Sequence, residues 1–227
     1  MKYDRILPGK FIARPNRFIA NVEINGKVEV CHVKNTGRCR ELLIPGADVF
    51  VQESDNPNRK TRYDLISVYK DDMLVNMDSQ APNKVFGEWA QTSGYFGEIT
   101  YIKPECKYKN SRFDYYIETK DRKIFVEVKG VTLENNGVVL FPDAPTERGI
   151  KHINELIDCI TEGYDSYIFF IIQMEKCKYF VPNRAGHPEF ADALLKGVTS
   201  GIKAKALKCN VTPESLVANS FVDVHMD

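Results

Sequence analysis

The sequence lacks any apolar run long enough to cross a membrane. Its longest strongly apolar run, YIFFII at residues 167–172, is far shorter than the ~18 residues that a membrane-spanning helix needs. The first ten residues, MKYDRILPGK, also lack the apolar core of a signal peptide. We therefore expect a cytoplasmic protein with no membrane partner, in which residues 167–172 form a buried central strand.

The cysteines lack the spacing that marks a structural metal site. None of the six forms a CxxC pair, and no cluster of histidines accompanies them. Several lie in apolar surroundings, such as Cys159 in LIDCI, as buried thiols do. We expect reduced and mostly buried thiols, as in a cytosolic protein, rather than disulfides or zinc ligands.

The chain also lacks net charge, because 31 basic residues balance 31 acidic ones. Bulk charge therefore does not indicate a polyanionic partner. The positive charge is nevertheless concentrated near the N-terminus, where residues 1–40 hold nine Lys or Arg and three Asp or Glu. Such a segment can form a basic surface for nucleic acid. The candidate contacts to DNA are Arg14, Arg17, Lys34, Arg38 and Arg40.

The same region contains aromatic residues and a glycine-containing loop. For each of them the sequence leaves two interpretations open. Tyr3, Phe11 and Phe18 could stack on the bases of a single strand, although a core position is the favoured interpretation. Arg38 stands beside a glycine in the predicted loop 35–38, Asn-Thr-Gly-Arg, where it could contact a phosphate. The alternative that this region binds a small anionic ligand such as a sugar phosphate stays open.

The apolar pattern predicts two structural parts. Residues 1–80 hold five or six short β-type segments and little helix, which favours a small barrel of the oligonucleotide-binding (OB) type. Asn25-Gly26 predicts a tight hairpin within it. From residue 81 the order becomes helix, three strands, helix, strand, which predicts an α/β fold with a mixed sheet. The expected helices are 85–96, with Pro82 or Asn83 near its start, 146–163 and 190–198, and residues 99–109 form a broken strand.

Residues 111–130, SRFDYYIETKDRKIFVEVKG, predict a hairpin that turns at Lys120-Asp121. Opposed residues then have numbers that sum to 241. Phe113, Tyr115 and Ile117 lie opposite Val128, Val126 and Ile124 in turn, and all six share one apolar face. The other face opposes Asp114 to Glu127 and places Lys129 beside Glu127. A slip by one residue would destroy both features.

Two opposed carboxylates in an apolar strand require compensation, because they repel each other and burial makes the repulsion stronger. A divalent cation with oxygen ligands would supply it, and Mg²⁺ uses one or two carboxylates together with substrate phosphates. A nearby ammonium then suits the cleavage of a phosphodiester. The alternative is a solvated sheet edge at which Lys129 bridges Asp114 and Glu127.

Several segments resemble the sugar fermentation stimulation protein family. These are HVKNTGRCREL, PGADV, PNKVFGEWA, SRFDYYI, FVEVKGVTLE and FPDAPTERGIKH, in this order. The resemblance covers most of the chain. It implies an OB-type barrel over residues 1–80, followed over residues 81–227 by a restriction-endonuclease-like domain of the PD-(D/E)XK group. It also implies nonspecific DNA binding and a regulatory role in sugar utilisation, particularly of maltose, without establishing catalysis.

The resemblance assigns roles to particular residues. Asp114 matches the nuclease Asp, and Glu127 and Lys129 match the (D/E)XK pair, which makes the three the candidate catalytic residues and the two acids the candidate ligands of Mg²⁺ or Mn²⁺. Glu88 matches a glutamate that many of these nucleases add from the preceding helix. The residues before Asp114 read SRF in place of proline. The ligands are therefore intact, which favours metal chemistry but also suits binding alone.

The helix predicted after Pro145 carries supporting candidates. Arg148 and His152 are four residues apart and share a helix face, from which they could orient phosphate or water. Glu147 is a third candidate, although Glu147 and Lys151 could simply form an ion pair on a solvated face. We expect His32 and His187 to be structural or exposed.

Overall fold

The computed structural model describes residues 1–35 and 37–226. The N-terminal part is a barrel whose strands neighbour one another in the order β3-β2-β1-β4-β5-β6. A parallel pairing of β3 with β5, Cys31 beside Tyr63, closes five of the strands into a ring. This confirms the expected OB-type barrel. The bounds are β1 Ile6–Asn16, β2 Ile19–Ile24, β3 Lys27–Val33, β4 Asp48–Glu53, β5 Tyr63–Lys70 and β6 Met73–Asn76.

The predicted hairpin lies between β2 and β3. Asn25 and Gly26 both have positive φ angles, 51° and 74°, the combination that a tight two-residue turn of this hand requires. Ile24 pairs with Lys27 directly across the turn. The Asn-Gly signal in the sequence therefore located this turn correctly.

The C-terminal part is built on a nine-stranded mixed sheet in the order β10-β11-β13-β15-β14-β12-β9-β8-β7. The central strand β12 pairs in parallel with both β9 and β14, and it contains the predicted buried run 167–172. The bounds are β7 Ile99–Tyr108, β8 Ser111–Thr119, β9 Lys123–Val131, β10 Leu133–Asn135, β11 Val138–Phe141, β12 Asp165–Ile172, β13 Tyr179–Pro182, β14 Lys203–Thr212 and β15 Ser215–Val224.

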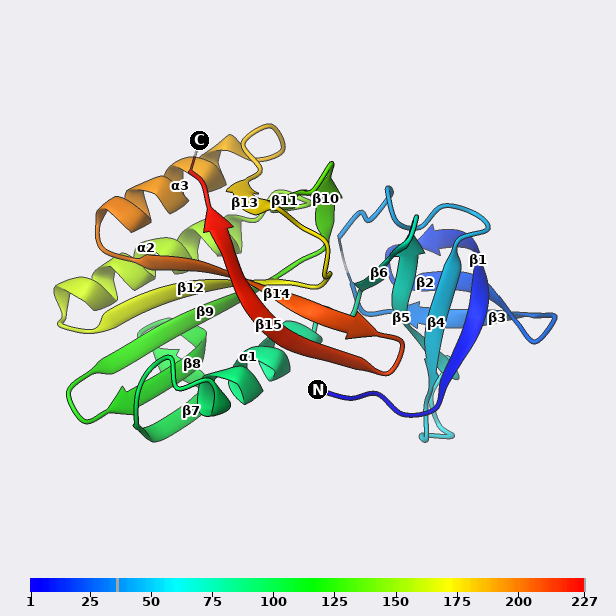
Figure 1. Cartoon of the computed structure of the whole chain (residues 1–227), viewed down its shortest axis with the longest axis horizontal. Helices are drawn as coiled ribbons and strands as arrows, with labels where there is room; N and C mark the ends of the chain where they lie inside the picture. The colour runs from blue at the N-terminus through cyan, green and yellow to red at the C-terminus, as the bar shows by residue number, and fades with distance from the viewer. Residues whose placement is uncertain (36, 227) are drawn as a thin grey trace.

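Helices cover both faces of this sheet, α1 (Ala81–Thr92) on one and α2 (Glu147–Thr161) with α3 (Pro188–Thr199) on the other (Figure 1). Each face has its own core. Phe86 of α1 packs on Phe169, whereas Phe190 of α3 packs on Phe141. Helix α1 begins at Ala81, which confirms the predicted start near Pro82 or Asn83, since proline suits the first turn; it ends at Thr92, before the predicted end at residue 96.

Two strand predictions need correction. The segment 99–109 is one strand, β7, rather than a broken one: it lies at the edge of the sheet, where Pro104 removes no needed hydrogen bond. Strands β10, β13 and β15 were not expected: the first two have only three and four residues, and in β15 exposed residues such as Val217 and Phe221 blur the alternation.

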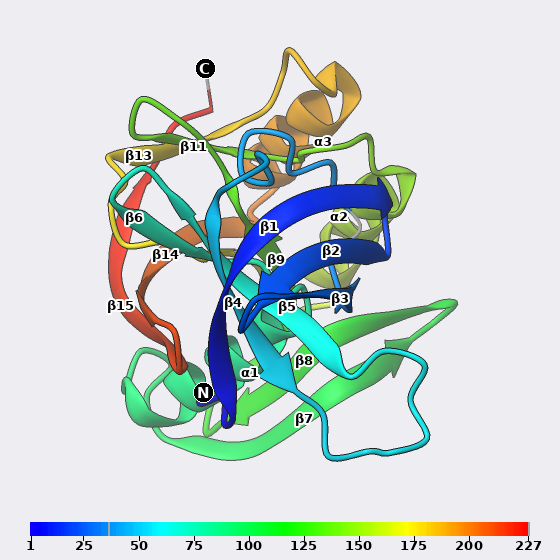
Figure 2. The same cartoon turned by 90° about the vertical axis from the view of Figure 1, so that its right-hand side faces the viewer.

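The barrel and the α/β part lie side by side (Figures 1 and 2), and direct bonds join them. The N–H group of Asn76 donates to the carbonyl of Gln173 over 2.9 Å, and the Lys70 ammonium pairs with Glu134 over 2.5 Å. The first residues also cross over, since the N–H group of Tyr3 donates to the carbonyl of Glu214. Residues 1–3 therefore pack on the C-terminal part rather than only on the barrel.

In the part of the chain that the structure describes, no helix is long and apolar enough to cross a membrane. All six cysteines are free thiols, and four of them are buried: Cys31, Cys39, Cys159 and Cys209.

Candidate functional site

The β8–β9 hairpin has the predicted register up to a defined point. Tyr115 pairs with Val126 and Glu118 with Lys123, so the numbers sum to 241 as expected. The ladder ends at Tyr115, and the two strands diverge beyond it. Phe113 consequently packs on Phe125, with ring centroids 5.3 Å apart. The prediction that Phe113 shares an apolar face with Val128 is therefore wrong, because the two residues belong to different cores. The divergence opens a place for carboxyl groups between the strands.

Asp114 occupies this place. Its Oδ2 accepts the N–H group of Val128 over 2.7 Å, which replaces the missing ladder bond, and its Oδ1 accepts Nδ2 of Asn83 over 2.8 Å. Asn83 belongs to the first turn of α1, which is fixed to β8 by a bond from the Tyr115 hydroxyl to the Asn83 carbonyl. Burial, and then the nearby charge of Glu127, raise the pKa of Asp114 to about 6.

Glu127 lies on the neighbouring strand β9 and is almost fully buried. Its Oε1 lies 2.5 Å from Nδ1 of His152 and 2.6 Å from Nζ of Lys129. Burial opposes ionisation, but the contact with His152 and the charge of Lys129 outweigh it, so the pKa of Glu127 is below its usual value. Two neighbouring acids thus have pKa values shifted in opposite directions.

The donor set suits a hard divalent cation. Oε2 of Glu127 is buried and accepts no hydrogen bond from a described residue, which leaves one carboxylate oxygen for a ligand. A cation beside it would also favour ionised Asp114. The described residues form no group of three or more acidic, histidine or cysteine ligands. The site fits an ion such as Mg²⁺, which takes its remaining ligands from water and phosphate.

The structure does not bring Glu88 into this site. Its carboxylate accepts the N-terminal ammonium of Met1 over 2.6 Å and is 62% exposed. The residue of α1 that does reach the acids is Asn83, five positions earlier. The role of third ligand expected for Glu88 is therefore wrong, because the helix turns this side chain toward the N-terminus of the chain.

Helix α2 contributes His152 and a cleft beside it. Nε of Arg148 lies 3.4 Å from Nε2 of His152, so the predicted pair does share a face and forms a chain from Arg148 through His152 to Glu127. Glu147 is exposed at the rim, and Lys151 pairs with Glu155 rather than with Glu147. The cleft has a volume of 800 Å³ and is lined by Lys107, Asn110, Ser111, Arg112, Glu147, Arg148, Lys151 and His152. Four of these side chains are Lys or Arg, which suits a polyanion; Arg112 also lies 3.2 Å from Glu105 and Lys151 3.8 Å from Glu155.

In the barrel, Arg14 proves to be structural. Its two terminal nitrogens donate to the carbonyls of Arg17, Asn35, Gly37 and Arg38, all within 2.9 Å. The guanidinium therefore holds the loop in place and has few donors left for DNA.

Lys34 is also occupied, because its ammonium lies 3.4 Å from both Asp64 and Asp78. Arg17, Arg38 and Arg40 remain exposed around a hollow of 350 Å³, and none of them pairs with a described carboxylate. Phe18 is exposed beside them with the Arg17 guanidinium over its ring, whereas Tyr3 and Phe11 are buried. Of the five predicted DNA contacts, Arg17, Arg38 and Arg40 therefore remain available to bind a phosphate at this hollow.

The loop that suggested a small anionic ligand lies next to a second cavity. Thr36 is outside the described residues. Asn35 and Gly37 line the cavity, in which Asp143 is the charged residue among those described and no basic side chain is present. A carboxylate repels an anion, so this lining does not suit a sugar phosphate.

Sequence reasoning missed Asn83, Lys107 and Arg112. Asn83 had a usable signal, since it stands in the first turn of a predicted helix that precedes the acid-bearing strands. Lys107 and Arg112 had no such signal in the sequence, because only the pairing of β7 with β8 brings them to the cleft beside α2.

Two family models match the chain. The model described as the SfsA N-terminal OB domain matches residues 12–77, and the model described as the sugar fermentation stimulation protein RE domain matches residues 80–215. The two matches together cover the barrel and most of the α/β part.

Full-length relatives and a solved structure are also similar. The sugar fermentation stimulation protein homolog of Clostridium beijerinckii is 60% identical over 99% of both chains, and that of Desulfitobacterium hafniense is 59% identical over 100% of this chain and 99% of its own. The structure of Pyrococcus furiosus SfsA in complex with Ca²⁺ superposes with a TM-score of 0.90 at 29% identity, covering 99% of this chain and 98% of that one.

Proposed function

Because the chain belongs to the sugar fermentation stimulation protein family, we propose that it binds DNA without sequence specificity and cleaves phosphodiesters at a nuclease-type site that uses Mg²⁺ or Mn²⁺. The observation that carries this proposal is the pair of acids. Asp114 and Glu127 lie on the neighbouring strands β8 and β9, close enough for the charge of Glu127 to raise the pKa of Asp114, and Oε2 of Glu127 is buried without a partner among the described residues.

Each residue has a role in this proposal. Asp114 and Glu127 would hold the cation, which supplies a polarised phosphate and an activated water. Asn83 and the Val128 amide fix the Asp114 carboxylate by two hydrogen bonds. Lys129 places an ammonium next to Glu127, where it can stabilise negative charge that develops on the phosphate.

His152 acts as a positioning residue. Its Nδ1 contact fixes Oε1 of Glu127 and thereby aims Oε2 away from the helix. Arg148 lies on the cleft side of His152, where it can hold a phosphate of the strand. The basic cleft and the arginine hollow of the barrel supply the cations that a nonspecific DNA-binding protein needs.

The Ca²⁺ complex of the relative from Pyrococcus furiosus supports the choice of a hard cation. Ca²⁺ and Mg²⁺ both prefer oxygen ligands, and they differ in size and in the geometry that they demand.

The six free thiols agree with a cytoplasmic location, which is part of the proposal.

A second candidate is a DNA-binding regulator of sugar utilisation, such as that of maltose, without catalysis. One observation favours it: Lys129 and His152 both contact Oε1 of Glu127, so the buried charge is compensated without a metal. Both candidates use the same DNA-binding surfaces. They differ only in whether Asp114 and Glu127 take part in the cleavage of DNA.

Cleavage assays separate the two candidates. Wild-type protein, Lys129→Met and the control Lys196→Met, whose residue is exposed on α3, are incubated with Mg²⁺ or Mn²⁺ and single-stranded, duplex or branched DNA. We expect cleavage of at least one substrate, a loss of about 100-fold or more in Lys129→Met, and no loss in the control. No cleavage of any substrate by the wild type would favour the regulator, and equal rates in all three proteins would refute the role of Lys129.

A further inference from the structure

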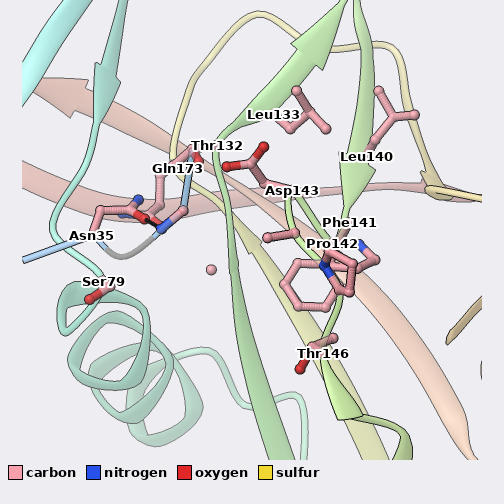
Figure 3. A pocket seen from close by; sticks show the side chains of 14 residues that line it. Asn35, Ser79, Thr132, Leu133, Leu140, Phe141, Pro142, Asp143, Thr146 and Gln173 are labelled. Carbon is pink, nitrogen blue, oxygen red and sulfur yellow. Dashed lines mark hydrogen bonds between the residues drawn. The ribbon is translucent and has the colours of Figure 1, made fainter. Parts of the chain in front are cut away.

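A cavity of 290 Å³ lies where the barrel meets the α/β part, and none of the roles above uses it (Figure 3). Its walls come from the loop after β3, the start of α1, the end of β9, the segment after β11 and the end of β12. The lining residues are Asn35, Gly37, Ser79, Gly130, Thr132, Leu133, Leu140, Phe141, Pro142, Asp143, Ala144, Pro145, Thr146 and Gln173. Gly130 directly follows Lys129, so the cavity adjoins the strand that carries the acids.

The two sides of the cavity differ in chemistry. Figure 3 shows the ring of Phe141 and the flat face of Pro142 on one side, with the polar groups of Asn35, Ser79 and Gln173 opposite. An apolar wall facing hydrogen-bonding groups suits a flat heterocycle, which stacks by its face and bonds by its edge.

Gln173 presents a fixed acceptor. The side chain is 1% exposed, and its Nε2 donates to the Asn76 carbonyl, to Asn76 Oδ1 and to the Asp78 carbonyl. These three bonds fix the orientation of the amide, so Oε1 is left as an acceptor with no described partner. A Cβ at Gly130 would lie 2.6 Å from this oxygen, so only glycine lets the backbone approach it.

Asp143 supplies a second acceptor. Its Oδ2 accepts the N–H group of Cys39 over 3.2 Å, which leaves Oδ1 for a ligand. Asn35 uses Oδ1 to accept the N–H group of Gly37 and keeps Nδ2 as a donor. Gln173, Asp143 and Asn35 thus offer two acceptors and one donor, beside the hydroxyls of Ser79, Thr132 and Thr146, with a negative charge and no basic side chain among the described lining residues. The lining selects a ligand with N–H groups and excludes a phosphate.

We propose that this cavity binds one nucleobase, turned out of the stack of the bound nucleic acid. The volume of 290 Å³ lies just below the range for ligand pockets, about 300–1,000 Å³, and suits one base. Enzymes that take up a flipped base read its Watson–Crick edge and stack on its face. Guanine fits best, because its edge combines two neighbouring N–H donors with one carbonyl.

This inference rests on the proposed DNA binding for the source of the base. A free nucleoside would satisfy the same groups, so the experiment separates the two sources. Ala144 lines the cavity from a loop, and Ala144→Trp fills the space without altering a strand. Ala185→Trp is the matched control, because Ala185 is exposed in a turn and does not line the cavity.

The first arm uses an end-labelled duplex with one 2-aminopurine flanked by guanines, so that a guanine leaving the stack unstacks the reporter, in EDTA so that no strand is cut. Anisotropy of the label reports binding, and 2-aminopurine emission reports unstacking. We expect the wild type and Ala185→Trp to raise the emission at least twofold, and Ala144→Trp to bind within about twofold of the wild-type affinity with less than half of that rise. Equal rises in all three proteins would overturn the proposal.

The second arm measures the thermal unfolding of the full chain with guanosine, with glucose 6-phosphate as the negative probe. A guanosine-dependent rise in Tm that Ala144→Trp loses would assign the cavity to nucleosides even if anisotropy shows no DNA binding, in which case the DNA-binding function alone fails. DNA binding without an emission change, together with no response to guanosine, would refute the nucleobase pocket and leave the proposed function intact.

Discussion

Arg14 in strand β1 and Arg38 in the loop after β3 have different roles although both are arginines of the barrel. Arg14 is held by four backbone carbonyls, whereas Arg38 is exposed, and among the described residues its carbonyl, which accepts from Arg14, makes its hydrogen bond. Both belong to the same basic segment of the sequence, and charge alone does not distinguish them. The hydrogen bonds do, since a guanidinium with filled donors cannot release them to phosphate without loss of the loop.

We therefore expect opposite effects from two alanine substitutions. Arg14→Ala should lower the free energy of unfolding by about 2 kcal/mol or more, because hydrogen bonds to a charged group contribute about 1.5–3 kcal/mol. Arg38→Ala should change it by less than about 0.5 kcal/mol and weaken DNA binding instead. Urea unfolding measures the first effect and anisotropy the second. A stable Arg14→Ala protein that has lost DNA binding would contradict this assignment.

Asp64 gives the barrel a pH dependence. Its carboxylate is 7% exposed and contacts Arg59 over 2.5 Å, Lys34 over 3.4 Å and His32 over 3.2 Å. Burial works against ionisation, but these contacts outweigh it and lower the pKa of Asp64. A lowered pKa in the folded state stabilises the protein above the unfolded value of about 3.9, and this contribution is lost as the pH falls below it.

The expected result is that Asp64→Asn costs about 2 kcal/mol at pH 7 and that the cost shrinks as the pH falls below about 4, toward the lowered pKa of the folded state. Urea unfolding at several pH values gives the comparison. Asp72→Asn serves as the control, since Asp72 is exposed and pairs with Lys176 at the surface. A cost for Asp64→Asn that is independent of pH would show that shape, not charge, stabilises this position.

At the scale of elements, the β8–β9 hairpin shows what the sequence could and could not predict. Its register followed from alternation alone, because a slip would have buried charge. The end of the ladder at Tyr115 did not follow, since alternation cannot reveal that the Asp114 carboxylate replaces a backbone acceptor. The same limit hid Asn83, whose role depends on how α1 packs against β8.

Helix α2 depends on its first turn to present His152. Thr146 caps the helix, and its side chain accepts the N–H group of Gly149 over 3.1 Å. We expect Thr146→Ala to cost about 1 kcal/mol, as measured by urea unfolding. Thr199→Ala at the exposed end of α3 should cost little, because its hydroxyl only bonds back to the Leu195 carbonyl. Equal costs would show that the cap does not determine the stability of α2.

At the scale of the whole molecule, two basic surfaces lie on different parts of the chain: the arginine hollow on the barrel and the cleft beside α2. The parts are joined by buried bonds such as those between Gln173 and Asn76, so the two surfaces keep a fixed relation. The separate barrel and sheet could be predicted from the sequence, but their docking could not, because it depends on a few polar contacts without periodicity.

If one DNA contacts both surfaces, the affinity should depend on salt through both. We expect Arg38→Ala/Arg40→Ala and Lys107→Ala/Arg112→Ala each to reduce the slope of log affinity against log salt by about 2, since each lost phosphate contact removes about 0.9. Lys120→Ala/Lys123→Ala at the hairpin tip is the control. A slope reduced by only one of the two pairs would show that DNA occupies a single surface.

The central claim is that Asp114 and Glu127 share a divalent cation. The most direct test is a crystal of the full chain soaked in Mn²⁺ and measured for anomalous scattering. We predict an anomalous peak in contact with both carboxylates, with Oε2 of Glu127 as one ligand, and no such peak in Glu127→Gln. A wild-type crystal at saturating Mn²⁺ with no peak between these two acids would contradict the account.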